Sequence, residues 1–118
     1  MEHLNTHTYA DIIQLITEEI YEADPSLLEK YGERGKQKCK EDNEHHFKHL
    51  ETAYALQSKQ VFIDYAIWLN GILQKHGMSA QHLIENFERI ARHISGRVEP
   101  EKEIKFLAYL QEGIRAIE

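Results

Sequence analysis

Four side chains that could take part in chemistry lie close together near the middle of the sequence: Cys39, Asp42, Asn43 and His46. They are three or four residues apart, the spacing that places side chains on one face of an α-helix. A thiol can anchor a ligand covalently, and an ionised carboxylate accepts hydrogen bonds from N–H groups. A helix that lies wholly against a core is apolar throughout, so this polar stripe predicts a face that borders a cavity, a partner or solvent.

The residues of this stripe do not complete a catalytic or metal-binding motif. His46 is two helical turns from Cys39, about 10 Å along the axis, which is too far to hold the thiol as a thiolate. His45 and His49 have the spacing of two ligands on one helix face, but no second cluster supplies the remaining ligands. We therefore expect neither an enzyme nor a metal site. On its own, Cys39 would be read as a small apolar filler.

Composition narrows the class of protein. A net charge of -6, with scattered basic residues, argues against nucleic acid as a partner. No run approaches the roughly 20 apolar residues that span a bilayer, so we expect no membrane partner. The single cysteine cannot form an intramolecular disulfide, which fits a reducing cytoplasm. A chain of 118 residues has room for one core.

Hydrophobic periodicity predicts an all-α protein of six helices without strands. Residues 1–7 are expected to be flexible, and residues 8–118 to form a single domain. Gly32, Gly77 and Gly96 are expected to end helices. The helices are expected to begin near Thr8, Pro25, Lys36, Ser58, Ser79 and Pro100. The long third helix, from about Lys36 to Leu56, carries the polar stripe in its first half.

Residues 34–42, R-G-K-Q-K-C-K-E-D, resemble the phycobiliproteins, in which a run of the type R-G-K-x-K-C-x-R-D begins the helix that carries the bilin. The resemblance continues in residues 63–67 and 78–82 and covers roughly residue 9 to the end of the chain. It implies a globin-like (phycobiliprotein-like) helical fold. It also implies a linear tetrapyrrole as the cofactor, a bilin such as biliverdin or phycocyanobilin.

The resemblance assigns a role to each matching residue. Cys39 is implied to be the thioether anchor, and Asp42 to accept hydrogen bonds from the pyrrole nitrogens. Lys36 and Lys38 would meet the propionates. The remaining residues implied to line the site are Asn43, His45, His46, Tyr65, Trp68 and His82. Departures from the family pattern are Glu41 in place of arginine, His45 and His46 in place of aromatic residues, and His82 in place of tryptophan.

Two other functions stay open from the sequence. Similar helical segments occur beside cobalamin-binding domains in bacterial regulators, so the chain could bind haem or a corrinoid such as cobalamin through His45 or His46. It could also be a ligand-free helical interaction module in bacterial signalling.

The family's two N-terminal dimerising helices have no counterpart here, which would leave an apolar face for a homodimer. The leading expectation is a cytoplasmic tetrapyrrole carrier or sensor.

Overall fold

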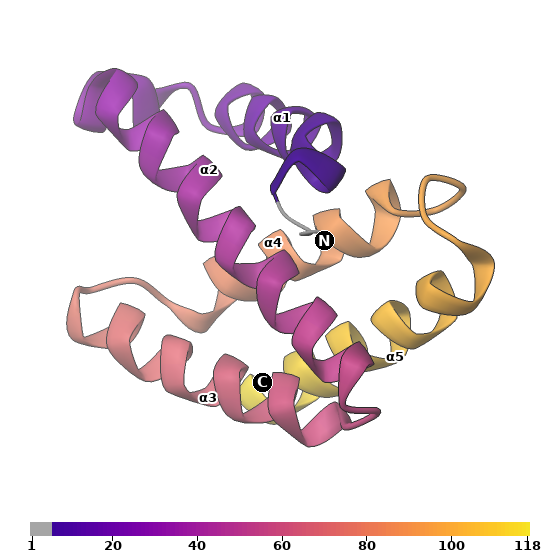
Figure 1. Ribbon diagram of the computed structural model, residues 1–118. Coiled ribbons are helices and arrows are strands. Elements are labelled where there is room, and N and C mark those ends of the chain that lie inside the picture. Colours follow the sequence, from indigo (N-terminus) through magenta and orange to yellow (C-terminus); the bar gives the residue numbers. More distant parts are fainter. Residues whose placement is uncertain (1–5) are drawn as a thin grey trace. The chain divides into compact units, whose positions relative to one another are not determined.

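The structure is a computed structural model that describes residues 6–118. Those residues form five α-helices and no strand (Figure 1), which confirms the all-α prediction. Of the stretch 1–7 that was expected to be flexible, residues 1–5 lie outside the described residues, and residues 6 and 7 belong to the first helix. The helices are α1 (Thr6–Ala23), α2 (Ser26–Ala55), α3 (Lys59–Lys75), α4 (Ala80–His93) and α5 (Pro100–Ile117).

Helix α2 covers two of the predicted helices, so the predicted count of six is not confirmed. Gly32 lies inside α2 with a φ of 64° and a ψ of -163°, a conformation that is essentially restricted to glycine. The sequence therefore predicts a break at the right residue. Helical backbone resumes directly after the break, so α2 consists of two helical segments that join at a kink at Gly32.

The chain divides into two compact units, and the boundary falls within α2. The first unit ends at Lys48 and the second spans His49–Glu118. The single domain expected for residues 8–118 stays a prediction. In the part of the chain that the structure describes, no helix combines the length and the apolar character needed to cross a bilayer.

In the first unit, α1 presents an apolar stripe at helical spacing. Its buried members are Tyr9, Ile12, Ile13 and Ile16. The ring of Tyr9 stacks on that of Phe47 in α2, with centroids 4.3 Å apart. Asp24 lies in the connection between the two helices, and its carboxylate accepts hydrogen bonds from the backbone N–H and the hydroxyl of Ser26, the first residue of α2.

In the second unit, α5 packs mainly on α3 and also on α4. The close approach of α5 to α3 depends on Gly113, since a Cβ atom there would lie 2.9 Å from the buried ring of Phe62. The last turns of α2 meet α5 through Lys102, which pairs with Glu51 at 2.9 Å and lies 5.3 Å from the ring centroid of Tyr54. These contacts hold α5 against α3 and against the last turns of α2. Helices α3 and α5 also carry large apolar side chains that are exposed.

Candidate functional site on α2

The four residues of the polar stripe lie on α2 within the first unit, and their burial differs along the stripe. Cys39 and Asp42 are partly exposed, whereas Asn43 is fully buried and His46 is 2% exposed. Cys39 is not part of a disulfide. The amino-terminal end of the stripe is therefore the end that an external ligand can reach.

Asn43 is held by the helix on which it lies. Its amide Nδ2 donates a hydrogen bond to the backbone carbonyl of Cys39 at 3.1 Å, and it lies 3.9 Å from the Cys39 Sγ. A buried amide needs such partners, because an unsatisfied one costs about 1–3 kcal/mol. This contact gives Asn43 a structural role, fixing the turn that carries the thiol.

Asp42 lies one turn beyond Cys39 and forms an ion pair with Lys38, at 3.2 Å between Oδ1 and Nζ. The two side chains are 42% and 70% exposed, so the pair is hydrated and screened. Such surface pairs contribute only about 0–1 kcal/mol. The carboxylate is therefore available to N–H donors of a ligand at little cost.

Tyr21 of α1 is a neighbour of the stripe that sequence spacing could not identify, because it lies 18 residues before Cys39. Burial raises the pKa of the Tyr21 phenol, and the charges of Cys39, Glu33 and Tyr31 raise it further. The Lys36 ammonium lies 5.6 Å from the centroid of the Tyr21 ring. Lys36, which was expected to meet a propionate, is therefore held beside this ring.

Close contact between Tyr21 and α2 depends on a glycine of the R-G-K run. A Cβ atom at Gly35 would lie 2.9 Å from the Tyr21 hydroxyl and 2.5 Å from the Cβ of Tyr31. Both distances are shorter than real contacts, so only glycine leaves room for the two tyrosines. Gly35 thus has a packing explanation that is independent of any ligand.

The two adjacent histidines face different surroundings. His45 is exposed and His46 is buried, as expected for consecutive residues of a helix. Of the two, His45 is the one whose side chain is exposed. Among the residues that the structure describes, no group of three or more histidine, cysteine or acidic side chains is arranged to hold a metal ion.

The other predicted site residues, Tyr65, Trp68 and His82, belong to the second unit. Tyr65 is buried and its ring stacks on His49, with centroids 3.7 Å apart. Trp68 is 61% exposed and its ring centroid is 6.4 Å from that of Tyr65. His82 is exposed at the start of α4, where its Nδ1 lies 3.3 Å from the hydroxyl of Ser79. The predicted set is thus divided between the two units, and a shared site for it stays a prediction.

Comparison with known proteins adds no family assignment: no protein-family model, curated protein or solved structure matches this chain.

Proposed function

We propose that this chain binds a linear tetrapyrrole on the α2 face that carries Cys39 and Asp42, and acts as a carrier or sensor. The proposal rests on one observation, a partly exposed cysteine outside any disulfide with a partly exposed carboxylate one helical turn away. The residues present fit a bilin. A thiol can add to an unsaturated carbon, and a carboxylate is the acceptor that several pyrrole N–H groups prefer.

Each residue of the stripe has a definite task in this proposal. Addition of the Cys39 S–H across a carbon–carbon double bond of the ligand forms one S–C and one C–H bond, and no group leaves. Asp42 accepts hydrogen bonds from the pyrrole N–H groups, and these replace its surface ion pair with Lys38. Lys38 then becomes available to a propionate. Asn43 keeps the Cys39 turn in place through its bond to the Cys39 carbonyl. A globin-like arrangement of the helices belongs to the same proposal.

An absorption spectrum tests the proposal. Purified protein is mixed with biliverdin or phycocyanobilin, and we expect a red-shifted band in the folded protein, bilin absorption that stays with the chain after denaturation, and a mass increase equal to the mass of the bilin. Cys39→Ser should abolish the covalent product, and Asp42→Asn should shift and weaken the band, because an amide accepts pyrrole N–H groups less strongly than a carboxylate.

Glu41→Gln is the matched control, since it removes an exposed carboxylate next to Asp42 in the sequence but on another face of α2. It should leave the band unchanged. An unaltered bilin spectrum with the unmodified protein would refute the proposal. A haem or cobalamin band that is lost in His45→Ala would instead support the corrinoid or haem alternative.

A second candidate function is a helical protein-interaction module. It is supported by large apolar side chains of the second unit that are exposed to solvent. Ile67 and Trp68 on α3 are 51% and 61% exposed, and Ile104 on α5 is 67% exposed. The internal hydrogen bond of Asn43 also fits a stripe that is purely structural. Failure of bilin, haem and cobalamin alike to give a band would favour this function.

A further inference from the structure

Helix α5 has two faces of different character. Its buried face consists of Phe106, Tyr109, Leu110, Gly113 and Ile117. Its opposite face is exposed and carries Glu101, Ile104, Leu107, Ala108, Gln111 and Arg115. Single exposed apolar residues are common on protein surfaces. Here, however, Ile104 and Leu107 are 67% and 37% exposed and follow one another on the same stripe.

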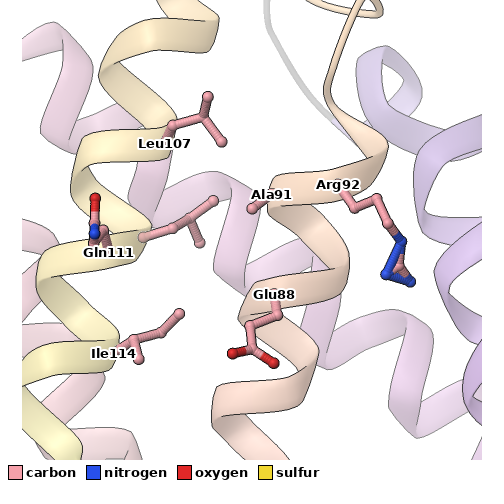
Figure 2. A pocket seen from close by; sticks show the side chains of 7 residues that line it. Glu88, Ala91, Arg92, Leu107, Gln111 and Ile114 are labelled. Carbon is pink, nitrogen blue, oxygen red and sulfur yellow. The ribbon is translucent and has the colours of Figure 1, made fainter.

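A groove between α4 and α5 runs beside this stripe (Figure 2). Its volume is about 520 Å³. Leu107, Gln111 and Ile114 line it from α5, and Ala91 and Glu88 line it from α4. The groove and the exposed stripe share Leu107 and Gln111, so they form one continuous surface that is apolar along its middle.

The charges at the two ends of the exposed face are opposite. Glu101 lies in the first turn of α5 and Arg115 in its last turn. Glu101 is seven residues before Ala108 and Arg115 is seven residues after it, two helical turns in each direction. If a second α5 crosses antiparallel with Ala108 at the centre, each Glu101 lies beside the partner's Arg115. A parallel arrangement would place like charges together at both ends.

The side chains between these charges suit the same arrangement. Ala108 is small, which allows two helices to approach closely at the centre of the contact. Ile104 then lies against the partner's Gln111, on the wall of the partner's groove. The surface is thus self-complementary about a two-fold axis, as an interface between identical copies must be.

We propose that two copies of this chain associate through antiparallel α5 helices, with each Ile104 entering the α4–α5 groove of the other copy. This surface belongs entirely to the second unit and does not depend on tetrapyrrole binding. A pair of helices about 27 Å long forms a small interface, so the dimer dissociates on dilution.

Sedimentation equilibrium over a range of protein concentrations tests this proposal. The average mass should rise from one chain towards two. Ile104→Lys should abolish the rise. Glu101→Arg and Arg115→Glu should each weaken association about tenfold, because either change replaces two attractive pairs with two repulsive ones.

Mixing the two charge variants gives the decisive result. In a heterodimer of Glu101→Arg with Arg115→Glu, both pairs are attractive again, so the mixture should associate as strongly as the original chain. The loss of the Arg115–Glu112 ion pair, at 3.5 Å, is the same alone and in the mixture, so it cannot produce this recovery. Glu29→Arg, which reverses an exposed acid in the first turn of α2, is the matched control and should not change association.

Three results would overturn the proposal. They are a single-chain mass at the highest concentration, association that persists in Ile104→Lys, and a mixture of charge variants that associates no better than its components. Far-ultraviolet circular dichroism of each variant shows whether its helices are intact, so that loss of association can be assigned to the surface.

Discussion

Gln57 adopts a backbone conformation that residues with a Cβ atom rarely adopt. It lies between α2 and α3 with a φ of 54°. Its N–H bonds to the Tyr54 carbonyl at 3.1 Å, and the N–H of Ser58 bonds to the Ala53 carbonyl at 2.9 Å. This pair of hydrogen bonds is the Schellman motif, in which the position of Gln57 is usually glycine.

Gln57→Gly should therefore stabilise the protein. Left-handed backbone costs a non-glycine residue about 1–2 kcal/mol, and the extra freedom of glycine in the unfolded chain offsets about 0.5–1 kcal/mol of that gain. We expect the free energy of unfolding to rise by about 0.5–1 kcal/mol, measured by urea denaturation. Gln57→Ala is the control, since it keeps the Cβ and loses only the exposed bond from Nε2 to the Tyr54 carbonyl. An equal gain in Gln57→Ala would contradict a backbone cause.

Residue spacing predicted part of the candidate site. It placed Cys39, Asp42, Asn43 and His46 on one face of a helix, which the structure bears out. It could not predict that Asn43 bonds back to Cys39, because an amide at that spacing can equally point outward. Nor could it predict Tyr21, which reaches Gly35 only through the packing of α1 on α2.

At the scale of helices, the contact of α5 with α3 is set by the missing side chain of Gly113. A Cβ atom there would lie 2.9 Å from Cε2 and 3.1 Å from Cδ2 of Phe62, and 3.4 Å from the Cβ of Ala66. Phe62 is fully buried, so its ring has no open space into which it can turn. Helix propensity favours alanine over glycine by about 1 kcal/mol, but overpacking a core typically costs about 1–3 kcal/mol.

Gly113→Ala should therefore lower the free energy of unfolding, by about 1 kcal/mol once propensity is included. Gly71→Ala is the matched control, because Gly71 also lies within a helix but is exposed, with no atom near its Cβ position. It should raise the free energy of unfolding by up to about 1 kcal/mol.

A double-mutant cycle with Phe62→Leu separates the two effects of Gly113→Ala, the gain in helix propensity and the cost of overpacking against the ring of Phe62. A smaller residue at position 62 relieves the contact, so the double variant should be more stable than the sum of the single changes by at least about 0.5 kcal/mol. Strict additivity of the two substitutions would mean that the ring of Phe62 does not limit this helix crossing.

Helix ends were more predictable than helix partners. Gly77 has a φ of 85° directly after the last turn of α3, as its place in the sequence predicts. Gly32 also has positive φ, yet α2 continues beyond it. A single glycine in a sequence does not show whether a helix ends there or is only kinked. Trp68 shows the limit of periodicity: its spacing fits a core or a ligand wall, but it is 61% exposed.

At the scale of the whole molecule, folding favours the protonated form of Tyr21 in the first unit and of Tyr109 in the second. Burial raises the pKa of Tyr109, and the charge of Tyr54 raises it further. Burial and then the charge of Cys39 raise the pKa of Tyr21. The net charge of -6 means that each further ionisation also adds to the negative charge of the folded chain.

These raised pKa values predict a loss of stability at alkaline pH. Above about pH 10, a tyrosine in the unfolded chain releases its proton while Tyr21 and Tyr109 in the folded chain still hold theirs, so the unfolded state binds fewer protons. The free energy of unfolding therefore falls as the pH rises through the pKa values that Tyr21 and Tyr109 have in the folded chain. Urea denaturation between pH 8 and pH 11 should show this fall, and Tyr21→Phe and Tyr109→Phe should each make it less steep.

Cys39→Ser distinguishes the two tyrosines, because the charge of Cys39 acts on Tyr21 and is not among the causes of the Tyr109 shift. When each phenol is followed by its own NMR signal, the pKa of Tyr21 should fall in this variant and that of Tyr109 should stay where it is. If both move together, the cause is a change in the fold. If neither moves, the thiol does not act on Tyr21, and the electrostatic coupling between α1 and the polar stripe of α2 is absent.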